Sequence, residues 1–479
     1  MSRRTLLPFL LFALIAFPQT RADAQESQTP SFVGEGTAAT PYLVSTAEQL
    51  RAIENAPNAY YRLVNDLTLE GTWTPLCQTT PFGGTLDGNG KEIASMNVES
   101  DACGALGLFA QIGESGRVRK LEISGRITTT GATQAAGGIA GRLLGGAVCD
   151  VESRVEIIVG ASTPSDASIG GLAGYSDGIV FCCEFQGKIN DERSSGGSVG
   201  AMIGRTGAIR SNALPKLVTA HAGFAAPKGA SDNSEDNTVA NIVKALKYRP
   251  DVIEVDVQPN ANGVLVITHN KPQKSDPTLE TVLRILMGEL PEGYDADEFD
   301  PDVARQTKIQ LDAKKDGLFR QELELLDAVK FPYERVIMAG DSEYETVLAN
   351  KELIRGAVER GLDFWMNPDR LASYDDLAKK SESFLERVRA LELPRLTVNS
   401  HYAAITDEIA EWLAENELDV SVWTLNDKNS IRANFLRGFK NVTSRLPLAT
   451  ETRDQCATRG VYGCVYSGSL PEIGIVGEN

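Results

Sequence analysis

Histidine and positive charge are both scarce in this chain of 479 residues. It contains three histidines, and its 47 lysine and arginine residues are outnumbered by 65 aspartate and glutamate residues. The resulting net charge of −18 argues against nucleic acid or an anionic membrane as a partner, because both are bound through basic patches. Long apolar runs are scarce as well. The run at residues 6–17 is shorter than the roughly 20 apolar residues that a membrane-spanning helix needs.

That apolar run has the features of a secretory signal. Arg3 and Arg4 precede it, and residues 22–24 read Ala-Asp-Ala, a cleavage site of the A-x-A type. We therefore expect residues 1–24 to be a signal peptide and residues 25–34 a linker. The mature chain is then expected in the periplasm, at the cell surface or in the medium, without a transmembrane segment.

Seven cysteines suit an exported chain, because disulfides persist outside the cytosol. Cys456 and Cys464 lie eight residues apart in the C-terminal tail, residues 451–479, and could close a small loop by a disulfide. The odd number of cysteines leaves at least one thiol unpaired or bonded to another molecule.

The first half of the chain carries an internal repeat. Gly107, Gly138, Gly171 and Gly200 mark its units, at spacings of 31, 33 and 29 residues. Each unit consists of short apolar segments punctuated by glycines and polar turns, and a period of this length indicates stacked supersecondary units. We therefore predict that each unit is one coil of a right-handed parallel β-helix, whose coils are buried only by stacking on one another.

These units resemble the GLUG-type repeats of bacterial exported and surface proteins. The segments that carry the resemblance are 107–127, 137–157, 170–189 and 199–212, and they are preceded by 40–53, 60–76 and 82–98, which are similar to the usual entry to such a solenoid. The resemblance implies a β-helix domain over residues 35–211. It also implies a role in surface display or in binding a surface partner that the sequence does not identify.

Two registers of the coils are open for the cysteines of this domain. In one register Cys149 stacks on Cys182, within disulfide distance. In the other, Cys149 faces Phe181 and Cys183 joins an apolar column with Val151. The second register is slightly favoured, and it makes these cysteines packing residues.

Strands and helices alternate in the second half. Nine apolar, β-branched runs occur there, and most are separated by amphipathic helical stretches; the runs are 217–223, 252–258, 264–270, 308–314, 335–340, 363–367, 395–400, 419–426 and 441–447. Repeated β-then-α units predict a parallel sheet, and about this number of strands suits a closed (β/α)8, or TIM, barrel over residues 214–450. The tight sequence Asn-Ala-Asn-Gly at 260–263 makes the third run a hairpin partner of the second.

Acidic residues alternate with apolar residues in the second run. Glu254 and Asp256 share one face of that strand, and two carboxylates inside a barrel would repel each other. A divalent cation removes the repulsion. Asp312 adds a third carboxylate, with Lys314 two residues further on, and such a set of oxygen ligands suits Ca²⁺ or Mg²⁺.

From residue 217 to about 447 the chain resembles the glycerophosphodiester phosphodiesterase family, whose members have a phospholipase-C-like barrel. Seven motifs carry the resemblance in order: His221-Ala222-Gly223, Asp236-Asn237-Thr238, Glu254-Val255-Asp256, His269-Asn270, Pro-Thr-Leu-Glu at 277–280, Asp312-Ala313-Lys314, and Trp-Thr-x-Asn at 423–426. The family hydrolyses phosphodiesters of glycerol to glycerol phosphate and an alcohol. The resemblance therefore implies a phosphoric diester hydrolase with a small phosphodiester substrate.

The resemblance also assigns roles to residues. Glu254, Asp256 and Asp312 become ligands of a divalent metal, Ca²⁺ or Mg²⁺, and His221 and His269 become the acid and base of catalysis. Lys314 and Trp423 become substrate-binding residues, the first through the phosphate and the second at the alcohol.

The chain departs from the family pattern at several of these motifs. Ala222 stands where the family has an arginine that contacts phosphate, Asn270 where it has an aspartate, and Asp236 and Asp312 where it has glutamates. Both histidines and all three carboxylates remain, so we expect an active enzyme with an altered substrate or an altered phosphate clamp. The alternative is a surface-binding or adhesion protein whose barrel is catalytically silent and whose β-helix carries the function.

Overall fold

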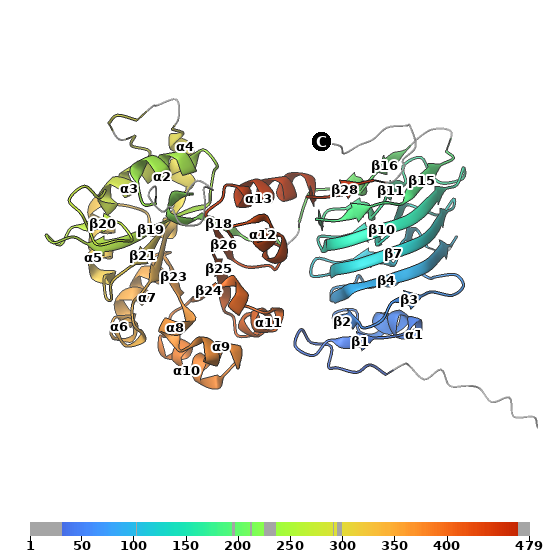
Figure 1. The fold of residues 1–479 in the computed structure, drawn as a ribbon, viewed down its shortest axis with the longest axis horizontal. Helices are drawn as coiled ribbons and strands as arrows, with labels where there is room; N and C mark the ends of the chain where they lie inside the picture. The colour runs from blue at the N-terminus through green and yellow to red at the C-terminus, as the bar shows by residue number, and fades with distance from the viewer. Residues whose placement is uncertain are drawn as a thin grey trace, which may run out of the picture.

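The computed structural model describes residues 31–467 except 102, 194–196, 211–212, 225–235, 291 and 295–298. The expected signal peptide, most of the expected linker and the last residues of the tail lie outside this part. The described chain forms two units that lie side by side (Figure 1): an N-terminal unit of stacked strands, residues 42–206, and a barrel, residues 217–444. No helix in the described ranges is both long enough and apolar enough to span a bilayer.

The N-terminal unit stacks its strands in three parallel sheets. The first contains β1 (Tyr42–Val44), β2 (Tyr60–Leu63), β4 (Thr85–Glu99), β7 (Arg117–Thr129), β10 (Ala147–Val159) and β13 (Ile179–Phe181), with β3 (Leu67–Thr68), β14 (Glu184–Phe185) and β15 (Lys188–Asp191) paired beside them. The second contains β5 (Ala105–Leu106), β8 (Ala135–Gly137), β11 (Ser168–Gly170) and β16 (Ser198–Gly200). The third contains β6 (Phe109–Ile112), β9 (Ala140–Leu143), β12 (Ala173–Ser176) and β17 (Ile203–Thr206).

The chain returns to the same place in the first sheet about every 30 residues. Val118 pairs with Val148 and Val148 with Val180, and all three side chains are buried. Such columns of apolar residues form the core of this unit, because no single repeat can bury its own apolar face. The short helix α1 (Ala47–Arg51), which Thr46 caps, lies at one end of the stack (Figure 1).

The repeated glycines mark a close approach between neighbouring segments of the chain. Gly137, Gly170 and Gly200 pair in register, and a Cβ atom on Gly170 would lie 2.1 Å from the carbonyl oxygen of Ala173. The glycine markers chosen from the sequence were therefore one residue out of register at two of the four units, because Gly137 and Gly170 each precede a second glycine. The structure also places Cys149 opposite Phe181, which is the favoured of the two predicted registers.

Eight parallel strands close the barrel. They are β18 (Leu217–Ala220), β19 (Val252–Pro259), β21 (Lys308–Ala313), β22 (Val336–Gly340), β23 (Asp363–Met366), β24 (Thr397–His401), β25 (Asp419–Trp423) and β26 (Asn441–Ser444). Closure follows because β18 pairs with both β19 and β26. β20 (Leu265–Ile267) pairs antiparallel with β19, as the tight turn predicted. The predicted closed barrel of eight strands is confirmed.

Short amphipathic helices connect the strands. They are α2 (Val239–Leu246), α3 (Leu279–Leu286), α4 (Pro301–Gln306), α5 (Phe319–Val329), α6 (Tyr344–Ala349), α7 (Lys351–Glu359), α8 (Pro368–Leu371), α9 (Tyr374–Ala378), α10 (Glu382–Ala390), α11 (Asp407–Glu415) and α12 (Lys428–Asn434). Threonine hydroxyls start several of them: the side chains of Thr238 and Thr278 accept hydrogen bonds from backbone N–H groups in the first turns of α2 and α3.

The end of the chain crosses from the barrel to the N-terminal unit. Helix α13 (Leu448–Arg459) lies between the two units in Figure 1, and β27 (Val461–Tyr462) and β28 (Val465–Tyr466) then add to the first sheet. β27 pairs with β13 and β28 pairs with β14, both in parallel. The boundary expected at residue 450 thus falls inside α13, and the tail packs on the N-terminal unit.

The disulfide considered between Cys456 and Cys464 is not formed in the structure. All seven cysteines are described with free thiols. Cys456 lies on α13 and is fully buried in a core cluster that joins the barrel to Phe181 of the N-terminal unit, whereas Cys464 follows β27 and lies against Cys183. Burial raises the pKa of the Cys456 thiol, and Cys149, Cys464 and Cys182 lie close enough to add to this effect.

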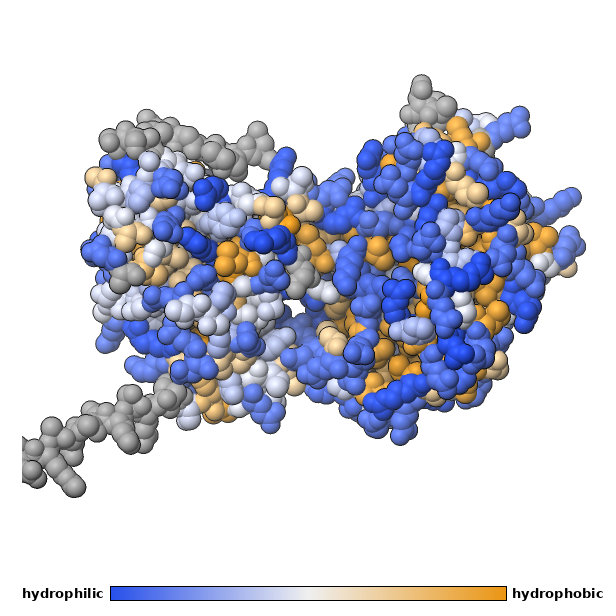
Figure 2. Space-filling view, turned by 180° about the vertical axis from the view of Figure 1, so that it is seen from behind, coloured by the Kyte–Doolittle hydropathy of each residue, from blue (hydrophilic) through white to orange (hydrophobic). Residues whose placement is uncertain are grey.

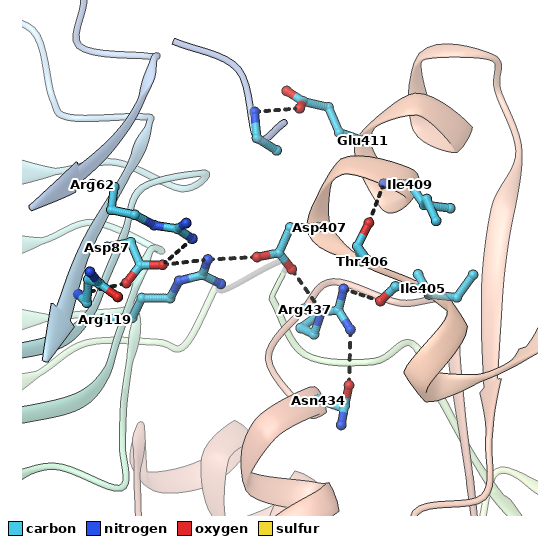
Figure 3. A network of polar contacts seen from close by, with 12 residues as sticks. Arg62, Asp87, Arg119, Ile405, Thr406, Asp407, Ile409, Glu411, Asn434 and Arg437 are labelled. Carbon is cyan, nitrogen blue, oxygen red and sulfur yellow. Dashed lines mark hydrogen bonds and ion pairs between the residues drawn. The ribbon is translucent and has the colours of Figure 1, made fainter. Parts of the chain in front are cut away.

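A chain of ion pairs joins the two units (Figure 3). Arg119 on β7 binds Asp87 on β4 at 3.2 Å and Asp407 at the start of α11 at 2.7 Å, and Arg437 binds Asp407 from the barrel side at 3.0 Å. Beside these residues a cleft of about 1200 Å³ separates the units, which Figure 2 shows as a hollow between them. None of the predicted site residues lines this cleft.

Candidate metal centre and active site

Three carboxylates meet at the carboxyl ends of two neighbouring strands. Glu254 and Asp256 point inward from β19 and are almost fully buried, while Asp312 lies opposite Asp256 on β21. Each of the three offers an oxygen, and these oxygens all lie within 4.8 Å of one another. The alternation on β19 and the parallel register with β21 therefore bring together the three residues that the sequence singled out.

Burial and mutual repulsion disfavour the ionised form of these acids. Burial first, and then the charges of Asp256 and Asp312, raise the pKa of Glu254 well above its usual value. Burial also raises the pKa of Asp312, although Lys314 opposes this effect. The barrel thus holds acidic groups that need a positive charge beside them.

Lys314 supplies one such charge. Its ammonium nitrogen lies 2.7 Å from Asp256 Oδ1 and also contacts Asp312. Burial disfavours the charged amine, but Asp312 and Asp256 outweigh this and raise the pKa of Lys314. The backbone fixes the position, because Lys314 N donates to the carbonyl oxygen of Val257 on the neighbouring strand at 2.9 Å.

Asn237 orients the central carboxylate. Its side-chain nitrogen donates to Asp256 Oδ2 at 2.6 Å, and its side-chain oxygen accepts from the backbone N–H of Asp256 at 2.9 Å. These bonds hold Asp256 in one rotamer. The Asp236-Asn237-Thr238 motif thus reaches the site through its asparagine, while its threonine starts α2.

His221 leaves β18 in a short 3-10 turn, His221–Gly223. In this turn the backbone N–H of Ala222 donates to Glu254 Oε2 at 2.8 Å, and the His221 side chain, 31 % exposed, places its Nδ1 atom 4.0 Å from the same oxygen. Within the described residues Nδ1 has no hydrogen-bond partner. Burial, followed by the positive charge of Arg445, lowers the pKa of His221 to about 4, so the imidazole is neutral at pH 7.

His269 follows β20 and is exposed at the same end of the barrel. Gln258 on β19 anchors its segment, because the Gln258 amide donates to the carbonyl oxygens of Thr268 and Asn270 at 2.8 and 2.7 Å. His269 lies close enough to His221 for its charge to contribute to the lowered pKa of His221. The structure therefore brings both predicted histidines to the edge of the carboxylate cluster.

Arg445 also belongs to this site, and the sequence reasoning missed it. Ala220 on β18 pairs with Ser444 on β26, so His221 and Arg445 leave neighbouring strands side by side. The Arg445 guanidinium contacts Asp236. The only signal in the sequence was its position near the carboxyl end of the last apolar run, residues 441–447, where barrel strands present their functional residues.

Trp423 ends β25 at the same end of the barrel. It pairs in register with His401 on β24, and the two rings meet edge to face with centroids 5.4 Å apart. Since β26 separates β25 from β18, Trp423 stands two strands away from His221. The structure thus places Trp423 on the rim, apart from the carboxylates.

The donor set fits a hard divalent cation. Two buried carboxylates and one half-buried carboxylate, with close oxygens, are the ligands that Ca²⁺ and Mg²⁺ prefer. The repulsion that raises the pKa of Glu254 is also the interaction that a bound cation would reverse. Glu254, Asp256 and Asp312 are therefore the residues that could hold it.

Comparisons with known proteins match parts of the chain. No protein-family model matches. A Gly-rich membrane protein of Evansella cellulosilytica is 27 % identical over 183 residues, covering 36 % of this chain and 20 % of that protein. Halomucin of Haloquadratum walsbyi is 31 % identical over 119 residues, covering 23 % of this chain and 1 % of halomucin. The chain thus spans a fifth or less of the length of these relatives.

Several solved structures are similar to half of the chain. A glycerophosphodiester phosphodiesterase from Parabacteroides distasonis is 15 % identical, with a TM-score of 0.36, and the match covers 50 % of this chain and 96 % of that one. A phosphodiesterase from Oleispira antarctica, solved with sn-glycerol-3-phosphate, is 17 % identical, with a TM-score of 0.34, covering 50 % and 97 %. A glycerophosphodiester phosphodiesterase from Agrobacterium tumefaciens is 15 % identical, with a TM-score of 0.32, covering 49 % and 98 %.

Proposed function

We propose that this protein is an exported, divalent-metal-dependent phosphodiesterase that hydrolyses glycerophosphodiesters, or a related phosphodiester, to glycerol phosphate and an alcohol. The observation that carries the proposal is the meeting of three carboxylates with two histidines at the carboxyl end of one barrel. In barrels of this kind the loops at that end hold the active site. The seven ordered motifs that resemble the phosphodiesterase family support the same assignment.

Glu254, Asp256 and Asp312 would hold the cation, Ca²⁺ or Mg²⁺. When bound, it would supply positive charge to a phosphate oxygen as negative charge develops there. Asn237 keeps Asp256 in its rotamer, and the N–H of Ala222 fixes one oxygen of Glu254. The chain itself therefore pre-organises two of the three ligands.

The two histidines would move the protons of the reaction. His221 is neutral at pH 7, since burial lowers its pKa, and its free Nδ1 can accept a proton from the attacking hydroxyl. His269 is exposed at the rim and is positioned to donate a proton to the leaving alkoxide. In-line displacement needs the base beside the attacking oxygen and the acid beside the leaving oxygen, on opposite faces of the phosphorus, so the phosphate would lie between the two imidazoles.

Arg445 would take over the phosphate contact of the family arginine, which is replaced by alanine at position 222. Its guanidinium comes from the strand next to His221 and is held by Asp236, at a motif where the family has glutamate. Lys314, already beside Asp256 and Asp312, would add a second positive charge. Trp423, on the rim, is suited to contact the alcohol.

The N-terminal unit would display the barrel at a surface or bind a surface partner. Its three parallel sheets, apolar columns and glycine register support a right-handed parallel β-helix of the GLUG type. Its function would be to place the barrel near a surface partner. Export through the signal at residues 1–24 is part of the same proposal.

The test is release of glycerol phosphate from glycerophosphodiesters with choline, ethanolamine or glycerol as the alcohol, in Ca²⁺, Mg²⁺ or EDTA. We expect turnover that EDTA abolishes and that His221→Ala and Asp256→Asn both remove. Calorimetric titration should show that Asp256→Asn no longer binds the cation. The matched control is Asp302→Asn, an exposed carboxylate on α4, which should leave activity and cation binding unchanged. No turnover of any diester, together with no cation binding, would favour the silent surface-binding protein instead.

A further inference from the structure

Cysteines from both ends of the chain gather where the tail meets the N-terminal unit. Cys149 lies on β10 of that unit, Cys182 and Cys183 lie between β13 and β14, and Cys464 lies between β27 and β28. Two of them are in contact: the backbone nitrogen of Cys183 lies 3.4 Å from the sulfur of Cys464.

The strand register pairs these two residues. Val180 pairs with Val461 and Glu184 with Val465, so both pairs are 281 residues apart. Cys183 and Cys464 have the same separation and therefore lie opposite each other, in the short connections that join these pairs of neighbouring parallel strands. Such strands lie about 4.8 Å apart, which falls within the Cα separations that disulfides span.

The neighbouring cysteines are placed less well for pairing with the tail. By the same register Cys182 faces Gly463, and a Cβ atom on Gly463 would lie 3.0 Å from the Cys182 sulfur. Gly463 has no side chain to bond, and Cys456 lies on α13, outside the strand register that aligns Cys464 with Cys183. The sequence, which offered Cys456 as the partner of Cys464, could not show this alignment.

We propose that Cys183 and Cys464 form a disulfide that fastens the tail to the N-terminal unit. The bond joins the last strands of the chain to the unit that begins it, and the barrel lies between them in sequence. Together with the Arg119–Asp407 ion pair, it holds the two units in a fixed relation across the cleft.

The chemistry requires a disulfide oxidant, and oxidised glutathione represents the class. The Cys464 thiolate attacks one sulfur of the oxidant and releases the first molecule of thiol, which leaves a mixed disulfide on Cys464. The Cys183 thiolate then attacks the Cys464 sulfur and releases the second. Two protons leave the protein thiols and two electrons pass to the oxidant. Cys464 is suited to the first step, since it is half-buried while Cys183 is fully buried, and the hydrogen bond from Cys183 lowers the pKa of Cys464.

The test is peptide mapping of the full-length chain after incubation with oxidised glutathione and alkylation of the remaining thiols. Without reduction, trypsin should leave residues 155–188, which contain Cys182 and Cys183, joined to residues 460–479, which contain Cys464. Cleavage after Arg459 separates Cys456 from Cys464, so a bond between those two would give a different pair of peptides. That pair, or unlinked peptides only, would overturn the proposal.

Two variants assign the bond within the first peptide. Cys182→Ser should leave the linked peptides intact, and Cys183→Ser should remove them. The oxidised wild-type protein should also melt several degrees above the reduced protein, and Cys464→Ser should melt at the same temperature in both conditions. Persistence of the linkage in Cys183→Ser would exclude the proposed bond, whatever the activity of the barrel.

Discussion

A buried carboxyl group outside the proposed metal site makes the stability of the barrel depend on pH. Glu322 lies on the inner face of α5, among the buried residues Phe319, Leu323 and Leu326. Within the described chain its Oε1 atom has no hydrogen-bond partner. Burial, and then the nearby charge of Asp312, raises the pKa of Glu322 to about 8.

The raised pKa has a defined sign and size. In the unfolded chain the group loses its proton near pH 4.5, whereas in the folded protein it keeps the proton up to about pH 8. Between these values the unfolded state binds fewer protons, so the free energy of unfolding falls as the pH rises. A full pH unit in this window contributes about 1.4 kcal/mol and less close to either pKa, so from about pH 5 to about pH 8 the loss is on the order of 3–4 kcal/mol.

The assay is urea unfolding of wild-type protein and Glu322→Gln across this pH range, followed by the fluorescence of the barrel tryptophans. EDTA must be present, because a cation at Asp312 would weaken one cause of the shift. We expect the free energy of unfolding of Glu322→Gln to rise steadily relative to that of wild type as the pH rises. The difference between the two proteins should be smallest near pH 5.

The matched control is Glu324→Gln, which removes an exposed carboxylate from the same helix. It should follow the pH dependence of wild type. If the stability curves of wild type and Glu322→Gln ran parallel from pH 5 to pH 8, the reasoning on burial would be refuted.

Other perturbations test the site and the interface. Arg445→Ala should lower kcat/KM about tenfold to a hundredfold by removing a charge-assisted contact to phosphate, with partial recovery in Arg445→Lys; unchanged kinetics would exclude the replacement of the family arginine. Arg119→Ala removes an ion pair between the units, so it should lower the free energy of unfolding by about 1–2 kcal/mol and speed proteolysis between the units. Arg126→Ala removes an exposed ion pair within one unit and should change neither the free energy of unfolding nor the rate of proteolysis. Val255→Ala should lower the stability measured in a melting experiment by about 2 kcal/mol. Asp256→Ala should abolish metal binding but lower the stability less, because it also relieves repulsion between Asp256 and its acidic neighbours. A larger loss of stability in Asp256→Ala than in Val255→Ala would contradict this.

Much of the fold could be predicted because its signals are local. The nine apolar runs of the second half became the eight barrel strands and the hairpin strand β20, since alternation along a strand shows which side chains face inward. The Asn-Ala-Asn-Gly turn showed which run is antiparallel. In the first half, glycine doublets caused the error of one residue, because either glycine of a pair satisfies the same spacing.

The site was predictable to the extent that it lies on single strands. Glu254 and Asp256 share a face of β19 by the two-residue period alone. Asp312 joins them only through the register of β21, which the resemblance implied and the strand pairing shows. Asn237 was visible as part of a motif, but its bonds to Asp256 depend on the path of the chain before α2.

The sequence by itself determined the alternation of apolar and polar positions, and with it the two kinds of unit and the acidic face of β19. The tertiary structure decided which residues distant along the chain become neighbours. It set Arg445 beside His221 through the closure of the barrel, and Cys464 beside Cys183 through the return of the tail. The reason is that local patterns depend on nearest neighbours along the backbone, whereas closure and docking depend on the packing of whole units, which no short stretch of sequence encodes.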